Sequence, residues 1–245
     1  MQNGLILKAG GRIVRAADLI RTGNPPAVLL RLGVPEIDAA LPWGGLPSGL
    51  HDIAAPFTDA GGAGFAATLL ARRPGAVLWC RLRRRTSEEG APYGLGLAVL
   101  GLPPAKLILV EAEKPIEILW AMEEGLRARG LAAVLGEGAH PDLTASRRLQ
   151  LAAETAQNMA LLISSESSGE KKSSGALAAM TRWHVTSLPS AAEAGGPGRP
   201  RWKIELRRCR GGGRPQDWMV EWNDTALSLS LVPALADRPL AAAAG

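Results

Sequence analysis

The first two thirds of the chain alternate short apolar runs with segments of helical period. The apolar runs have strand length and few polar positions, as expected of strands buried on both faces of a parallel sheet. They cover 50–55, 76–81, 106–111, 131–137 and 160–164. The helical segments cover 34–41, 65–70, 93–100, 115–129 and 142–156. This alternation predicts an α/β fold, with a mostly parallel sheet flanked by helices.

The last third of the chain changes period. Apolar and polar residues alternate at 179–188, 202–208 and 218–222, a pattern typical of half-exposed antiparallel strands. A glycine-rich stretch at 211–215 is placed to join the last two as a hairpin. We therefore expect antiparallel C-terminal strands to extend the parallel sheet.

A chain of 245 residues suits one α/β domain with short extensions. We expect an N-terminal arm at 1–33, with a short helix at 16–21, a core at 34–230 and a C-terminal tail at 231–245. The two cysteines lie in apolar or strand-like runs and suit a reducing compartment, and the three scattered histidines offer no metal-ligand spacing. No apolar run reaches the length of about 18 residues that a membrane span needs, and the N-terminus lacks the layout of a signal peptide.

The seven tryptophans are expected mainly to pack. Trp79, Trp120 and Trp183 lie within predicted core elements. The others are expected to be more exposed. Two of them, Trp202 and Trp218, are interleaved with arginines. For these two, the alternative to packing is that they stack on bases or anchor a partner. The more exposed set is Trp43, Trp202, Trp218 and Trp222.

The stretch 41–64 has the layout of a phosphate-binding loop. A glycine turn, Gly-Gly-Leu-Pro-Ser-Gly at 44–49, leads into an apolar strand, a loop of small residues and then a helix. A P-loop needs Gly-Lys-Ser/Thr at its end, yet the sequence has no lysine between Lys8 and Lys106. The loop therefore has the scaffold of a nucleotide site without its cation. The residues of this degenerate loop are Ala55, Pro56, Ala60, Gly61, Gly62 and Gly64.

Basic residues are concentrated in two stretches of a chain whose net charge is +5. The first runs from Arg72 to Arg85 without an acid, and the second runs from Arg199 to Arg214 with Glu205 as its one acid. Such stretches can meet phosphate backbones, and a solvated surface is the alternative. A further pair of lysines lies in the polar loop 165–175. The candidates for contact with DNA are Lys171, Lys172, Arg201, Lys203, Arg207, Arg208 and Arg210.

The sequence from Leu41 to Pro56, with its intact glycine turn, resembles the start of the RecA-like recombinase core and is similar to the ImuA family of degenerate RecA-like proteins. The resemblance places Gly61 and Gly62 near the Lys-Thr pair of the P-loop. It places Arg81 to Arg83 where the recombinases have their catalytic glutamate. It places Glu137 at the end of the strand that holds Mg²⁺ in the recombinases. We favour a plain strand-end carboxylate for Glu137, with contact to a metal as the alternative. It implies a RecA-like P-loop-type core, no catalytic residue and no cofactor, with ATP and Mg²⁺ expected only if the loop still binds nucleotide.

The resemblance implies a non-catalytic accessory protein of error-prone translesion synthesis in the SOS response to DNA damage. Its implied partners are an inactive Y-family polymerase relative, an error-prone C-family polymerase and RecA itself, with non-specific DNA contact and a cytoplasmic location near the nucleoid. Two alternatives stay open. One is a DNA-stimulated RecA-like ATPase of recombination or repair, and the other is a cell-division inhibitor of the SulA type.

Overall fold

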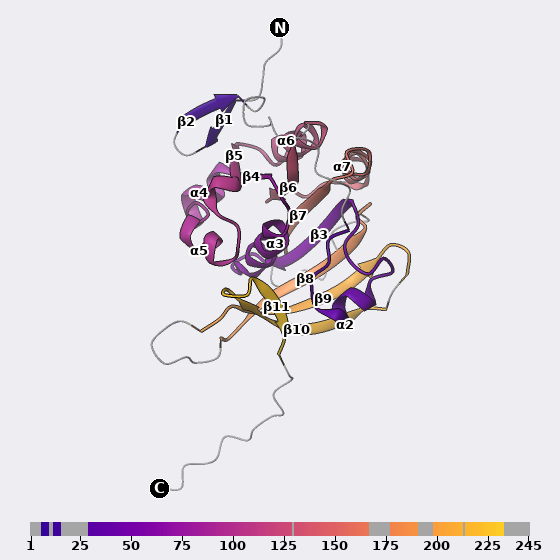
Figure 1. Ribbon diagram of the computed structural model, residues 1–245. Helices are drawn as coiled ribbons and strands as arrows, with labels where there is room; N and C mark the ends of the chain where they lie inside the picture. The colour runs from indigo at the N-terminus through magenta and orange to yellow at the C-terminus, as the bar shows by residue number, and fades with distance from the viewer. Residues whose placement is uncertain are drawn as a thin grey trace, which may run out of the picture.

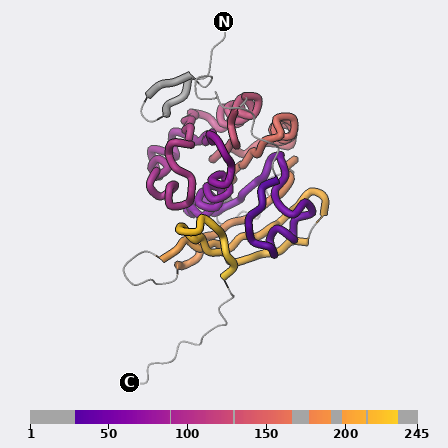
Figure 2. Tube along the Cα trace, viewed as in Figure 1, coloured from indigo at the N-terminus to yellow at the C-terminus, as the bar shows by residue number. Residues whose placement is uncertain are grey.

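The computed structural model describes residues 6–9, 12–15, 29–128, 130–166, 177–190, 198–212 and 214–232 (Figures 1 and 2). The strands are β1 (Ile6–Ala9), β2 (Arg12–Arg15), β3 (Gly49–Pro56), β4 (Ala76–Leu82), β5 (Leu107–Ala112), β6 (Leu131–Glu137), β7 (Met159–Glu166), β8 (Thr181–Leu188), β9 (Arg201–Cys209), β10 (Gln216–Asn223) and β11 (Ser228–Leu231). The helices are α2 (Pro35–Ala40), α3 (Gly61–Ala71), α4 (Arg83–Glu89), α5 (Gly94–Val99), the 3₁₀ turn η1 (Pro104–Lys106), α6 (Pro115–Arg127) and α7 (Leu143–Thr155).

The described strands form one mixed sheet in the order β11-β10-β9-β8-β3-β7-β6-β4-β5-β1-β2. Strands β3 to β7 pair in parallel, and β8 joins β3 in parallel before β9, β10 and β11 continue antiparallel. The backbone of β1 pairs with β5 at the opposite edge. The predicted parallel sheet with antiparallel C-terminal strands is confirmed.

Alternate residues of the parallel strands enter two separate cores. In β7, Leu161 and Ile163 belong to the core on the α3 side, while Ala160 and Leu162 belong to the core under α6 and α7. Figure 1 shows α6 and α7 beside the upper strands, with β8 to β11 below them. Because the central parallel strands are buried on both faces, their sequences are apolar at nearly every position, which made these strands easy to predict.

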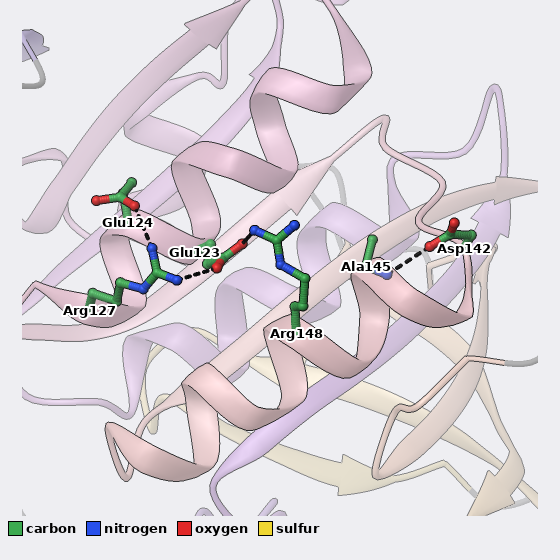
Figure 3. Close-up of polar contacts among 6 residues, drawn as sticks. All are labelled: Glu123, Glu124, Arg127, Asp142, Ala145 and Arg148. Atoms are coloured by element: carbon green, nitrogen blue, oxygen red, sulfur yellow. Dashed lines mark hydrogen bonds and ion pairs between the residues drawn. The ribbon is translucent and has the colours of Figure 1, made fainter.

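Helices α6 and α7 are joined by a buried carboxylate. Glu123 of α6 accepts a hydrogen bond from Arg127 on its own helix and another from Arg148 on α7, both at 2.5 Å (Figure 3). The start of α7 is fixed as the sequence predicted, because the Asp142 carboxylate accepts the backbone N–H of Ala145 at 2.7 Å. The two helices therefore cover their face of the sheet as one layer.

The two halves of the sheet meet at the seam between β3 and β8, where His51 is fully buried. Its Nε2–H donates to the carbonyl oxygen of Pro47 at 2.9 Å, so Nδ1 accepts the hydroxyl proton of Thr181 at 2.8 Å. Thr181 in turn accepts the indole N–H of Trp183 at 2.8 Å. Burial lowers the pKa of His51 to about 4, although its hydrogen bond to Pro47 acts in the opposite direction. A neutral histidine thus ties the glycine turn to the antiparallel strands.

Three tryptophans lie differently from the expectation. Trp120, expected in the core, is 59% exposed on the outer side of α6. Trp202 and Trp222, expected to be more exposed, are almost completely buried. Trp202 packs edge-on against Phe65 of α3, with ring centroids 6.5 Å apart. The inner face of β9 and β10 closes over α3, and the periodicity of these strands does not reveal that covering helix.

Core packing begins before the expected boundary at residue 33, since Leu30 and Leu32 are buried and Leu30 bridges to Leu46. The expected helix at 16–21 and the tail beyond residue 232 lie outside the described residues. The expected limits of the arm and of the tail stay predictions.

Candidate functional site

The site lies where β3 ends and α3 begins, at the carboxyl edge of the parallel strands. Residues 57–60 connect the two elements, so the predicted strand–loop–helix layout is present. The helix starts earlier than expected, because Gly61 to Gly64 form its first turn instead of ending the loop. The degenerate loop is therefore shorter than the sequence suggested.

The glycines of this first turn fit against their neighbours without room for side chains. A Cβ on Gly62 would lie 2.8 Å from the Cβ of Ala55, and a Cβ on Gly61 would lie 2.8 Å from the Oγ of Ser187. These are the positions that the resemblance matches to the P-loop Lys-Thr pair. Because α3 packs closely against β3 and β8, there is no room at these two positions for the side chains of a Lys-Thr pair.

A carboxylate of the protein itself lies at the amino end of α3. Asp59 Oδ1 accepts the backbone N–H of Gly61 at 2.7 Å and the hydroxyl of Ser187 at 2.5 Å, and its Oδ2 accepts the backbone N–H of Ser187 at 2.7 Å. Burial raises the pKa of Asp59, but the hydrogen bonds from Ser187 and Gly61 outweigh it and leave the pKa below its ordinary value. The ionised carboxylate thus occupies the position where a helix amino end binds an anion.

The second group of the site surrounds Glu137 at the end of β6. Its Oε2 accepts the indole N–H of Trp79 at 3.0 Å and lies 3.5 Å from Nε of Arg81, while its Oε1 lies 3.8 Å from Nη1 of Arg85. Glu137, Arg81 and Arg85 are each less than 10% exposed. The carboxylate that the resemblance places near Mg²⁺ therefore faces two guanidinium groups, an arrangement that opposes binding of a cation.

The two arginines have further partners that fix them in place. Arg81 donates to the carbonyl of Gly90 at 3.0 Å, and Arg85 donates to the hydroxyl of Ser165 at 3.2 Å. The guanidinium of Arg85 also lies over the ring of Phe57, 5.0 Å from its centroid, in a cation–π contact. The sequence resemblance matches Arg81 to Arg83 to the region of the recombinase glutamate that activates water, and a guanidinium cannot act as that base.

A cavity of about 810 Å³ opens between these groups. Its lining is mainly apolar and aromatic, and it also includes polar side chains. The chemically distinctive residues among those that line it are Phe57, Asp59, Trp79, Arg81, Arg85, Tyr93, Glu137, Ser165, Ser187 and Trp202. Of the six loop residues singled out in the sequence, Ala55, Pro56, Ala60, Gly61 and Gly64 line this cavity, while Gly62 packs against Ala55.

The candidates for DNA contact in β9 lie in a ladder of ion pairs. Arg201 is 2.6 Å from Glu221, and Lys203 lies between Glu205 at 3.2 Å and Asp217 at 3.3 Å. These two acids raise the pKa of Lys203 through hydrogen bonds and charge. The basic stretch of the sequence is thus interleaved with acids from β9 and β10.

The other candidates have separate partners. Arg207 lies 3.7 Å from Glu205, Arg208 donates to the carbonyl of Leu177 at 3.1 Å, and Arg210 lies 3.8 Å from Glu154 of α7. Lys171 and Lys172 lie outside the described residues. Contact with DNA by any of these residues stays a prediction.

Sequence reasoning missed Asp59 and Arg85 as members of the site. A signal for Asp59 was available, since Asp is a preferred residue at helix starts and precedes the glycine run closely. Its partner Ser187 lies far along the chain, however, and no local pattern connects them. Arg85 was seen as one charge of a basic stretch, and only the fold turns it toward Glu137.

The described residues show neither a metal site nor a membrane-spanning helix. Among them, no group of three or more His, Cys, Asp or Glu side chains is placed to hold a metal ion. Within the same residues, none of the helices combines the length and the apolar character needed to cross a bilayer.

The chain resembles known proteins in sequence and in fold. No family model matches it. Two curated relatives named Protein ImuA, from Caulobacter vibrioides strains NA1000 / CB15N and ATCC 19089 / CIP 103742 / CB 15, are each 37% identical over 237 residues, which cover 89% of this chain and 94% of the relative. A RadB recombinase crystal structure superposes with a TM-score of 0.58 at 13% identity, covering 83% of this chain and 100% of RadB. That likeness shows a RecA-like fold, and the sequence relatives show the family: the chain belongs to the ImuA family.

Proposed function

We propose that this protein is a non-catalytic RecA-like accessory factor of error-prone translesion synthesis in the DNA-damage response. Family membership and the RecA-like fold support a role in that response. The observation that carries the non-catalytic part is Asp59, whose carboxylate takes the anion position at the amino end of α3. With a carboxylate there and no lysine in the loop, nucleotide phosphates would meet repulsion instead of a counter-charge.

The charges around Glu137 support the same proposal. A P-loop ATPase holds Mg²⁺ near a carboxylate and activates water with a base. Here Arg81 and Arg85 neutralise the carboxylate of Glu137. The protein would then act by binding other chains, and the partners implied by the family are the inactive Y-family polymerase relative, the error-prone C-family polymerase and RecA.

Nucleotide binding and turnover test the non-catalytic part. Purified protein is titrated with a fluorescent ATP analogue and Mg²⁺, and ATP hydrolysis is followed with and without single-stranded DNA. We expect neither binding nor turnover. The same titration is made with Asp59→Ala. Because this variant lacks the carboxylate at the amino end of α3, we expect it to bind the ATP analogue weakly at most. DNA-stimulated hydrolysis by the wild type that Glu137→Gln abolishes would contradict the proposal and favour the ATPase alternative.

Assembly tests the scaffolding part. The protein is mixed in turn with the purified Y-family relative and the C-family polymerase of the same organism, and complexes are resolved by analytical ultracentrifugation. We expect a stable complex with at least one of the two. Its absence with both, together with binding to the cell-division GTPase, would instead favour the SulA-type alternative.

DNA contact is the remaining part of the proposal. We expect weak, non-specific binding of single-stranded DNA that falls steeply with salt, since phosphate contacts release counterions. Fluorescence anisotropy of a labelled oligonucleotide measures it, and the paired variants Arg207→Gln and Lys171→Gln compare the strand with the loop. Binding that neither variant weakens would place the contact elsewhere.

A further inference from the structure

The antiparallel half of the sheet ends at β11, and none of the described residues forms a strand beyond it. At the opposite end, the edge strand β2 carries Arg12 and Arg15, and charged side chains on an edge discourage the addition of another strand. β11 has the sequence Ser-Leu-Ser-Leu, which includes neither a charge nor a proline. Of the two edges, β11 is therefore the one that favours further pairing.

The hydrogen bonds of β10 show which of its residues bond to β11. Trp222 donates its backbone N–H to the carbonyl of Pro200, on the β9 side, at 2.9 Å. Met219 instead accepts the backbone N–H of Val232, on the β11 side, also at 2.9 Å. Successive residues of a strand direct their backbone groups to opposite sides, so the two bonds agree in fixing the alternation along β10.

The same alternation fixes the outward groups of β11. Ser228 and Ser230 lie opposite the residues of β10 that bond toward β11, and their backbone groups therefore point into the sheet. Leu229 and Leu231 direct their backbone groups the other way. The edge thus presents two N–H and two C=O groups, arranged symmetrically about Ser230.

The side chains of the edge are apolar on the face that continues the core. Leu229 is buried there, whereas Leu231, which lies opposite the buried Val220, is 37% exposed. Leu227, in the turn before the strand, is 50% exposed and lies against Gly101 beside α5. The other face of the strand carries the two serines. An added strand would therefore cover apolar surface as well as satisfy backbone groups.

A second copy of β11 matches this edge in both respects. When the two strands run antiparallel with Ser230 opposite Ser230, Leu229 of each copy lies opposite Leu231 of the other. All four outward groups of each strand then find their complement, giving four hydrogen bonds between the copies. The leucines meet on one face, and the two-fold arrangement closes without leaving an open edge.

We propose that two copies of this protein associate through their β11 edges, which continue one sheet into the other across a two-fold axis at Ser230. The inference goes beyond the proposed function and does not depend on it. A four-residue ladder is shorter than most stable interfaces, so the dimer should form in the micromolar range and dissociate on dilution.

Sedimentation equilibrium of the full-length protein over a series of concentrations measures the association. The wild type should show a reversible equilibrium between monomer and dimer. Leu231→Pro removes an outward N–H that makes no hydrogen bond within the sheet, and proline is tolerated on strand edges. Because the dimer loses two of its four hydrogen bonds, the variant should dimerise about tenfold more weakly or worse. Thermal melting checks that it folds.

A pair of charge variants tests the two-fold axis itself. Ser230 is exposed, and Ser230→Lys or Ser230→Glu places like charges opposite each other, which should weaken each dimer by about fivefold. An equimolar mixture of the two variants should dimerise more strongly than either alone, since opposite charges then meet. The matched control is Thr225→Lys, which adds the same charge at an exposed position in the turn before β11 and should dimerise like the wild type.

Four results would overturn the proposal. The first is a wild type that stays monomeric throughout the micromolar range. The second is a dimer that Leu231→Pro does not weaken, which would place the interface elsewhere. The third is a mixture of the charge variants that associates no better than its components. The fourth is a monomeric wild type whose complex with a polymerase partner is lost in Leu231→Pro, which would assign the edge to a strand of that partner.

Discussion

The two halves of the sheet use their arginines in opposite ways. Around the parallel strands, Arg73, Arg81 and Arg85 are 2%, 4% and 8% exposed, and they bind carbonyl, amide or carboxylate groups of the interior. In the antiparallel half, Arg201 and Arg207 join partly exposed ion pairs with Glu221 and Glu205. Two stretches that look alike as charge density in the sequence therefore differ. The first contributes three arginines to the interior, although its Arg83 and Arg84 form surface ion pairs, whereas the second lies mainly at the surface.

This difference predicts that removal of a charge lowers the free energy of unfolding more in the parallel half than in the antiparallel half. A buried ion pair that loses one partner leaves an uncompensated charge in a medium of low dielectric, while a surface pair is replaced by water. The following predictions test this contrast, from the largest expected effect to the smallest.

Glu137→Gln should have the largest effect. It leaves Arg81 and Arg85 close together without their shared counter-charge, and we expect the free energy of unfolding to fall by about 3 kcal/mol. Urea denaturation measures the change. A loss below about 1 kcal/mol would show that water reaches these guanidinium groups and that the parallel half is not distinct in this respect.

The seam at His51 should make stability depend on pH. The pKa of His51 is about 4 in the folded protein and 6.5 in the unfolded chain, so the unfolded chain binds the proton more readily. The stabilisation is complete above pH 6.5 and is lost as the pH falls toward 4, by about 2 kcal/mol at pH 5. His51→Gln should flatten this dependence in urea unfolding near pH 7 and near pH 5. An unchanged slope in the variant would assign the acid sensitivity to other groups.

Asp59→Asn should lower the free energy of unfolding, measured by urea denaturation, by about 1 kcal/mol at neutral pH. The reason is that an amide is a weaker acceptor than a carboxylate at the amino end of α3 and toward Ser187. The folded pKa of Asp59 is lowered, so its contribution is present above the unfolded pKa and is lost as the pH falls through the folded value. Wild type and variant should therefore converge in stability on acidification. Parallel curves at all pH values would contradict an ionised Asp59.

Glu221→Gln should have the smallest effect, below about 1 kcal/mol, since it breaks an ion pair with Arg201 that is more exposed than the contacts of Glu137. The same urea experiment measures it, and added salt should reduce the difference from the wild type. A cost as large as that of Glu137→Gln would remove the contrast between the two halves.

Much of the fold could be predicted from local patterns. The parallel strands are apolar throughout because both faces are covered, and α7 begins at Asp142 because its side chain caps the helix. The pattern was less informative where burial depends on a distant element. Trp222 is buried because its strand folds over α3 and α5, and its indole donates to the carbonyl of Val99 at 2.9 Å. The edge strand β11 was not predicted, although its four residues, Ser-Leu-Ser-Leu, alternate in polarity as a strand does.

The sequence by itself determined the alternation of buried strands and helices in the parallel half, the glycine turn and the absence of the P-loop lysine, because these are properties of neighbouring residues. Only the tertiary structure decided that Asp59 meets Ser187, that Glu137 lies between Arg81 and Arg85, and that Trp120 faces solvent. Those contacts join groups far apart in the chain, and their strength comes from burial. Periodicity reports which side of an element is apolar, but it does not report what covers that side.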